Sequence, residues 1–209
     1  RKFHVITHAI ADLGIRNTLD AYEAAAKSNG PRDRRFRIEH IENIHSADIP
    51  RFGRLGVIAS MQPLHAYPGP NLEAIWGRNV GPGRMPNSFA WHSLAAGGAR
   101  LNFGSDWPVV TLDPFEGIQN AVTRQRTDGT PAAGWVPEQR VKLDQALAAY
   151  TRDAAWGQFE ENIKGTLTPG KLADVIVLSQ DLFKISTLDI YKTKVLLTVV
   201  GGKVVYEEK

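Results

Sequence analysis

Three short segments each run from apolar residues directly into a side chain that commonly binds metal ions. They are HVITHA at residues 4–9, FRIEHI at residues 36–41 and LNFGSDWPV at residues 101–109. In a barrel of parallel strands the strand ends gather at one face, so His8, His40 and Asp106 would converge around one ion. Imidazoles and a carboxylate suit zinc and similar divalent ions, and an open coordination position favours hydrolysis by a metal-activated water.

The segments that would position these residues alternate between strand-like and helix-like patterns, which is typical of parallel β/α units. The strand-like runs are residues 2–7, 36–40, 57–61 and 100–103. The helical patterns between them are residues 11–28, 46–55 and 88–96. Residues 63–86 are rich in Pro and Gly, and we expect them to form an excursion over the active face.

The pattern changes after Asp106. Helical patterns continue at residues 114–126, 142–150 and 152–159, with a Gly- and Pro-rich loop at residues 127–137. From Lys164 onward the chain becomes strand-like at residues 174–178, 194–200 and 203–207, which favours a small antiparallel sheet. We therefore expect a partial β/α barrel over residues 1–163 and part of an accessory β domain over residues 164–209.

Composition excludes several classes of protein. The 209 residues carry a formal net charge of +3, are 43% hydrophobic and contain no cysteine, which removes disulfides and thiolate ligands. No apolar run approaches the roughly 20 residues that span a bilayer. The only dense basic cluster, Arg32, Arg34, Arg35 and Arg37, includes an aspartate and predicts a solvated turn rather than a nucleic-acid site. The chain begins at Arg1 and enters a strand at once, so we expect the later part of a longer protein.

Seven motifs, in this order along the chain, carry a resemblance to a known family. They are THAIAD, RIEHI, ASMQPLH, FGSDWPV, DPFEGIQNAVTR, ALAAYTRDAA and GTLTPGKLADVIVL. The chain resembles the C-terminal half of a protein of the amidohydrolase superfamily, in the amidohydrolase 3 group, which is also described as YtcJ-like. Ala11 stands where that group usually has glycine.

The resemblance implies an α/β fold: the second half of a TIM-type (β/α)8 metal-dependent hydrolase barrel, followed by strands of a small C-terminal β-sandwich domain. It implies that His8 closes barrel strand five, His40 strand six and Asp106 strand eight, with residues 60–62 on strand seven. In the family a His-x-His pair on strand one and a carboxylate on strand four complete a site for one or two zinc ions. Neither feature is present in this chain.

Asp106 is the candidate catalytic residue, because a carboxylate beside the ion can take a proton from water and return it to the leaving nitrogen. Four further residues are candidates for binding substrate or supporting a ligand: Asp12, Gln62, His65 and Trp107. Asp12 either orients His8 or caps a helix, His65 either binds substrate or supports a ligand, and Trp107 either forms a pocket wall or ends a strand. Strand alternation predicts that Glu39 points away from the metal.

Three functions compete at this stage. The leading hypothesis is the C-terminal part of an amidohydrolase that cleaves C–N bonds in small amides or cyclic amides. The second is a non-catalytic fragment, or a half-barrel that needs a missing N-terminal half or a second copy of the chain. The third, a basic module for polyanions, is disfavoured because basic and aromatic residues do not interleave. We expect no nucleic-acid or membrane partner, and we favour a cytoplasmic location although the absence of cysteine does not fix the compartment.

Overall fold

The computed structural model describes residues 3–69 and 72–209. Its centre is a parallel sheet in the order β1-β2-β3-β4. The strands are β1 (Ile6–Ala9), β2 (Arg37–His40), β3 (Ile58–Met61) and β4 (Arg100–Phe103). In the β1–β2 pairing His8 lies opposite Glu39, and in the β2–β3 pairing Glu39 lies opposite Ser60. Because all four strands are parallel, their carboxyl ends share one edge of the sheet.

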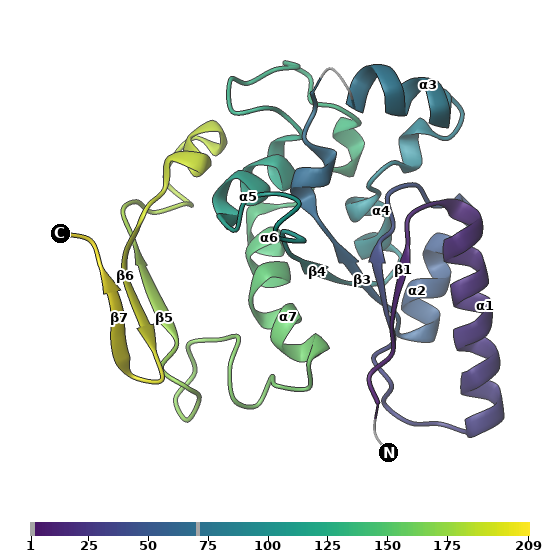
Figure 1. Cartoon of the computed structure of the whole chain (residues 1–209), viewed down its shortest axis with the longest axis horizontal. Helices are drawn as coiled ribbons and strands as arrows, with labels where there is room; N and C mark the ends of the chain where they lie inside the picture. Colours follow the sequence, from purple (N-terminus) through teal and green to yellow (C-terminus); the bar gives the residue numbers. More distant parts are fainter. Residues whose placement is uncertain (1–2, 70–71) are drawn as a thin grey trace.

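Helices follow the strands and pack beside the sheet (Figure 1). They are α1 (Asp12–Asn29), α2 (Ile49–Leu55), α3 (Gly77–Val80), α4 (Trp91–Ala96), α5 (Pro114–Thr123), α6 (Leu143–Tyr150) and α7 (Arg152–Gly157). On α1, Ile15, Leu19 and Tyr22 are buried, which is the i, i+4, i+7 spacing of a single helix face. This repeated strand and helix order is the parallel β/α arrangement that the sequence predicts.

The predicted excursion at residues 63–86 contains short helical segments rather than open loop. They are Pro63–Ala66, Leu72–Trp76, α3 and Met85–Asn87. Within the described residues, no helix is both long and apolar enough to cross a bilayer.

Helices α4 and α5 are both shorter than their sequence patterns predict. Helix α4 begins at Trp91 rather than at residue 88, because Phe89 has a left-handed φ of 49° and donates its N–H to the Glu42 carbonyl at 2.8 Å. Helix α5 ends at Thr123, because Arg124 also adopts a left-handed φ, of 58°. Its N–H still bonds to the Asn120 carbonyl, while its side chain turns into the core. Tertiary contacts decide both helix ends.

Arg124 is completely buried among aromatic rings. Its guanidinium lies 4.4 Å from the centre of the Trp91 ring and 5.0 Å from that of Trp135, and its Nε donates to the Trp135 carbonyl at 2.8 Å. Burial lowers the pKa of Arg124, since the charged form loses its hydration. The backbone carbonyls and ring faces compensate for that loss, and they join α5 to the segment that precedes α4.

A second, antiparallel sheet lies at the C-terminal end of the chain, beyond the predicted division between residues 163 and 164. It contains β5 (Val175–Leu178), β6 (Val195–Val200) and β7 (Lys203–Glu207), in that order. In Figure 1 this sheet stands apart from the parallel sheet, at the opposite side of the view from α1. The predicted antiparallel strands are therefore present, with every residue of β7 exposed.

Candidate metal centre

Two of the three predicted metal ligands lie side by side at the carboxyl edge of the parallel sheet. His8 is the third residue of β1, and His40 is the last residue of β2. Their imidazole ring centroids lie 4.4 Å apart, with the ring planes at 67°. His8 is exposed, whereas His40 is buried, and the Nδ1 atom of His40 has no hydrogen-bond partner among the described residues.

The third predicted ligand, Asp106, approaches these histidines through His65. Asp106 lies beyond the end of β4, and His65 lies in the helical turn that follows β3. The Nε2 atom of His65 is 3.8 Å from Oδ2 of Asp106, and the rings of His65 and His40 are nearly parallel with centroids 5.6 Å apart. Residues at or beyond the carboxyl ends of β2, β3 and β4 therefore lie close together.

Glu42 also belongs to this group. Its Oε1 atom lies 3.4 Å from Nδ1 of His65. One ligand-type atom from each of His40, Glu42 and His65 lies within 4.8 Å of the other two, which is close enough for a shared cation. Glu42 follows His40 by two residues in the EHIE sequence. It lies beyond the end of the strand, so strand periodicity does not predict where its side chain points. Only the path of the loop brings it to His65.

The backbone is strained where it presents these ligands. His40, Ile41 and Asp106 have positive φ angles of 77°, 51° and 58°. Non-glycine residues rarely adopt this left-handed region, and a β-branched residue such as Ile41 does so least readily. Such outliers concentrate at functional sites because the surrounding structure must hold them in place.

The loop that carries Glu42 is held from both sides. The N–H of Asn43 donates to the Ile10 carbonyl beyond β1 at 3.1 Å, and its side-chain amide donates to Ser88 Oγ at 3.1 Å. Trp76 Nε1 donates to the same Ser88 hydroxyl at 2.9 Å. The excursion over the active face therefore fixes the loop after β2, which in turn fixes Glu42.

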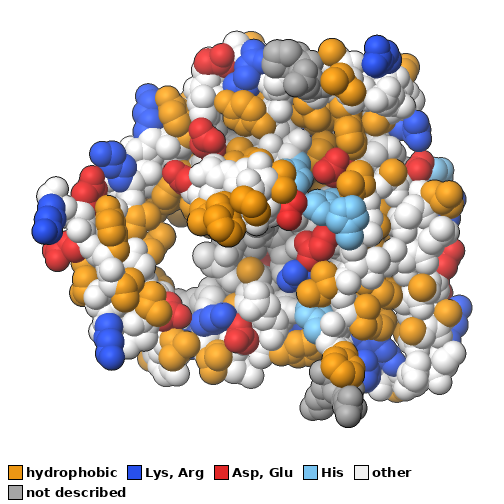
Figure 2. Space-filling view, in the orientation of Figure 1, with side chains coloured by type: hydrophobic (Ala, Val, Ile, Leu, Met, Phe, Trp, Pro, Cys, Tyr) orange, Lys and Arg blue, Asp and Glu red, His pale blue; other side chains and the backbone are white. Residues whose placement is uncertain are grey.

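Beside His40 is a cavity of about 330 Å³, lined mainly by polar residues of β2, β3 and β4 and the loops beyond them, and on one side by Ala154 and Gln158 at α7. Glu39, His40, Gln62 and Asp106 all line it. Glu39 and His40 share this cavity although alternation predicts opposite sides, because the left-handed φ of His40 breaks the extended strand geometry. Figure 2 shows histidine side chains grouped beside acidic side chains on this face of the molecule.

The three remaining predicted site residues, Gln62, Trp107 and Asp12, lie in three different environments. Gln62 is buried, and its Oε1 atom lacks a hydrogen-bond partner among the residues that the structure describes. Trp107 is 63% exposed and precedes a cis peptide bond to Pro108. Asp12 begins α1, where its Oδ1 accepts from the Leu13 N–H at 2.8 Å and its Oδ2 lies 3.5 Å from Nη1 of Arg84.

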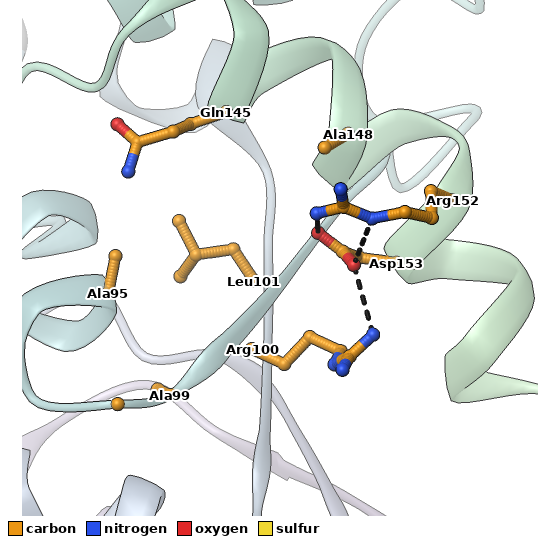
Figure 3. Close-up of a pocket in the computed structure, with 9 residues that line it drawn as sticks. Ala95, Ala99, Arg100, Leu101, Gln145, Ala148, Arg152 and Asp153 are labelled. Carbon is orange, nitrogen blue, oxygen red and sulfur yellow. Dashed lines mark hydrogen bonds and ion pairs between the residues drawn. The ribbon is translucent and has the colours of Figure 1, made fainter.

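A larger cavity, of about 530 Å³, lies at the other end of β4 (Figure 3). Its charged groups are already paired: Asp153 accepts from Arg100 at 3.1 Å and from Nε of Arg152 at 3.0 Å. Arg100 begins β4, whereas Asp106 follows the strand's other end, so this cavity does not share the metal-type ligands.

Part of the basic cluster at residues 32–37 departs from the solvated turn that its charge pattern predicts. Arg35 is buried, and its Nη2 lies 2.6 Å from Oε1 of Glu161. The hydrogen bonds from Arg35 lower the pKa of Glu161 to about 2. Arg37 pairs with Glu39 at 2.6 Å. These ion pairs engage two of the arginines internally, which further disfavours a polyanion site.

Residues 1–206 match the amidohydrolase family. The chain belongs to this family. Protein LONG AFTER FAR-RED 3 of Arabidopsis thaliana is 39% identical to this amidohydrolase chain over 203 residues, which cover 97% of the chain and 34% of that protein. The putative amidohydrolase YtcJ of Bacillus subtilis (strain 168) is 30% identical, with coverage of 98% and 37%. N-substituted formamide deformylase of Arthrobacter pascens is also 30% identical, with coverage of 96% and 36%. The chain spans about a third of the length of these relatives.

Solved structures share the fold of this chain. An uncharacterized metal-dependent hydrolase from Pyrococcus horikoshii OT3 has a TM-score of 0.72 and 25% identity, with 88% of this chain and 35% of that chain covered. Atrazine chlorohydrolase TrzN from Arthrobacter aurescens TC1, complexed with zinc, has a TM-score of 0.62 and 20% identity, with coverage of 98% and 44%. The fold of this amidohydrolase chain is the second half of a TIM-type barrel with strands of the C-terminal β domain, as the sequence predicts.

Proposed function

We propose that this chain carries part of the active site of a metal-dependent hydrolase that cleaves C–N bonds other than peptide bonds, in a small amide or cyclic amide. The observation that supports it most is the grouping of three histidines and Asp106 at the carboxyl ends of the four parallel strands, with His40 and Asp106 lining one cavity. The similarity to N-substituted formamide deformylase supports this substrate class. The metal we propose is zinc, with which TrzN is complexed.

The residues present fit a divalent ion. His40 has a buried ring nitrogen without a partner among the described residues, as a nitrogen reserved for a cation would have. We propose that His8, His40 and Asp106 hold the ion, since neutral imidazoles and a carboxylate are the donors that zinc prefers outside thiolate sites. When bound, the ion would supply Lewis acidity toward a carbonyl oxygen and toward water.

Side chains of this chain would transfer the protons and bind the substrate. Asp106 accepts a proton from the attacking water at a carboxylate oxygen and returns it to the leaving nitrogen, acting first as general base and then as general acid. The buried amide oxygen of Gln62 is free to accept a hydrogen bond from a substrate N–H in the cavity. Trp107, exposed beyond β4, would form part of the wall around the substrate.

Metal content per chain tests this proposal without a substrate. Desalted protein should retain about one zinc-like ion per chain by inductively coupled plasma mass spectrometry, and H40A should lose it. H92A is the matched control, because His92 is an exposed histidine on α4. Circular dichroism would verify that H40A is folded. A wild-type chain without stoichiometric metal, or equal metal in H40A, would overturn the proposed centre.

A second proposal concerns what the chain needs for turnover. Within the described residues β1 pairs only with β2 and β4 only with β3, so the parallel sheet has two unpaired edges. Val5 and Ile6, at the β1 edge, are 40% and 49% exposed. Unpaired apolar edges favour covering by another polypeptide. We propose that the half-barrel gains activity when the first half of a barrel or a second copy covers these edges.

Light scattering together with a hydrolysis assay on an N-substituted formamide tests this second proposal. We expect little turnover from a monomeric chain. A dimer with turnover that falls on dilution would support covering by a second copy, whereas rapid hydrolysis by the monomer would contradict the proposal.

A further inference from the structure

His65 lies between the carboxylates of two other residues. It lies in the helical turn after β3, with a side chain that is 12% exposed. Nδ1 of the ring faces Oε1 of Glu42 at 3.4 Å, and Nε2 faces Oδ2 of Asp106 at 3.8 Å. The imidazole therefore bridges carboxylates that come from the loops after β2 and β4.

The two ring nitrogens have different surroundings. Glu42 lies closer to Nδ1, at 3.4 Å, than Asp106 lies to Nε2, at 3.8 Å, which favours the tautomer with the proton on Nδ1 and leaves the lone pair on Nε2. Nε2 is buried and has no hydrogen-bond partner in the part of the chain that the structure describes. A buried polar atom without a partner calls for a physical explanation, and a lone pair directed at a cation site provides one.

The position of the ring agrees with this explanation. His65 stacks nearly parallel to His40, at 10° between the ring planes, and His40, Glu42 and His65 each place a ligand-type atom within 4.8 Å of the others. A carboxylate that holds a histidine whose other nitrogen binds an ion is a common arrangement in metal proteins. Glu42, whose Oε1 lies 3.4 Å from Nδ1 of His65, is placed for that role.

We propose that His65, oriented by Glu42, is a further donor to the divalent ion held by His8, His40 and Asp106. This inference rests on the proposed function. With His65, residues of this chain alone supply four donors, which is the number that a tetrahedral zinc site needs. Retention of the ion would then not depend on the strand-one and strand-four ligands that the family resemblance implies.

Titration of the metal-free chain with Zn²⁺ and with Co²⁺ tests the inference. Isothermal titration calorimetry gives the zinc affinity, and the visible absorption of bound Co²⁺ reports its coordination. We expect H65A to weaken zinc binding at least tenfold and to change the Co²⁺ spectrum. E42Q should weaken binding about tenfold, because the loss of an outer carboxylate commonly costs 10- to 100-fold in metal affinity. H92A should bind as the wild type does.

The outcomes separate this inference from the proposed function. If H40A abolishes binding while H65A keeps the wild-type affinity and Co²⁺ spectrum, His65 is not a ligand and the proposed function stands. If the wild-type chain binds no ion, both proposals are overturned. Should H65A fail to fold by circular dichroism, H65N keeps a polar side chain of similar size without the imidazole. Wild-type affinity in H65N would then contradict the inference.

Discussion

The imidazole rings of His8 and His40 lie 4.4 Å apart at the carboxyl edge of the parallel sheet. The register of β1 and β2 sets His8 opposite Glu39 and Ala9 opposite His40, so the two histidines are offset by one residue, and the left-handed φ of His40 accompanies their contact. They differ in burial, since His8 is exposed and His40 is packed within the protein. Because of this difference, a substitution of the exposed His8 tests metal binding with little effect on folding.

Replacing His8 by alanine should weaken zinc binding without destabilising the chain. The side chain is exposed, and exposed substitutions usually change the free energy of unfolding by no more than about 0.5 kcal/mol. We expect zinc affinity to fall tenfold or more in calorimetry, with an unchanged thermal midpoint in the absence of metal. His45, an exposed histidine before α2, provides the control H45A. Equal zinc affinity in H8A and H45A would exclude His8 as a ligand.

Gly117 should be intolerant of alanine because of Tyr150. A Cβ atom at Gly117 on α5 would collide with the Tyr150 hydroxyl on α6. Alanine favours a helix over glycine by about 1 kcal/mol, but the overpacking should outweigh this and cost a net of about 1–3 kcal/mol. Urea denaturation of G117A, Y150F and the double variant measures the coupling.

The double variant is the informative one. Removing the hydroxyl in Y150F takes away the colliding atom, so G117A should cost less in the Y150F background than in the wild type. G83A is the control, because a Cβ at Gly83 meets nothing within 4 Å. Simple additivity of G117A and Y150F would show that the collision is not the cause.

The ion pair between Arg35 and Glu161 should make stability depend on acidic pH. Hydrogen bonds from Arg35 lower the pKa of Glu161 to about 2, below its ordinary value of 4.5. A carboxylate with a lowered folded-state pKa contributes stability above its unfolded pKa and loses that contribution as the pH falls toward its folded pKa. The contribution of Glu161 should therefore be complete above about pH 4.5 and decline between pH 4.5 and 2.

Denaturation of wild type and E161Q across this range tests the expectation. E161Q should be less stable at pH 6, and the difference from wild type should shrink as the pH approaches 2. D144N, which removes an exposed carboxylate on α6, should show no such convergence. A difference that stays constant with pH would show that the ion pair does not cause it.

Arg124 should not tolerate lysine. Its planar guanidinium bonds to the Trp135 carbonyl and lies on the face of Trp91, and a lysine ammonium cannot reproduce both contacts. Because the position is fully buried, R124K should lower the free energy of unfolding by about 2 kcal/mol or more. R54K is the control, since the Arg54 side chain is 64% exposed. Equal stabilities of R124K and R54K would contradict a structural role for the buried cation.

Local patterns in the sequence were sufficient for much of the fold. The strand at Arg100–Phe103 has the predicted bounds, and the other parallel strands lie within a few residues of theirs. The reason is that burial on a pleated strand or on one helix face repeats with a short period along the chain. The same periodicity placed His8, His40 and Asp106 at or just beyond strand ends, where a parallel sheet gathers its ligands.

Tertiary contacts decided the features that the periodicity of the sequence does not encode. Glu42 meets His65 because hydrogen bonds from Asn43 and Phe89 fix the loop after β2 against the excursion. Glu39 shares a cavity with His40 because the backbone leaves extended geometry at the strand end. Arg124 ends α5 because its side chain finds carbonyls and aromatic rings elsewhere in the chain. Each outcome depends on contacts between residues distant in sequence, whose energies outweigh local preference.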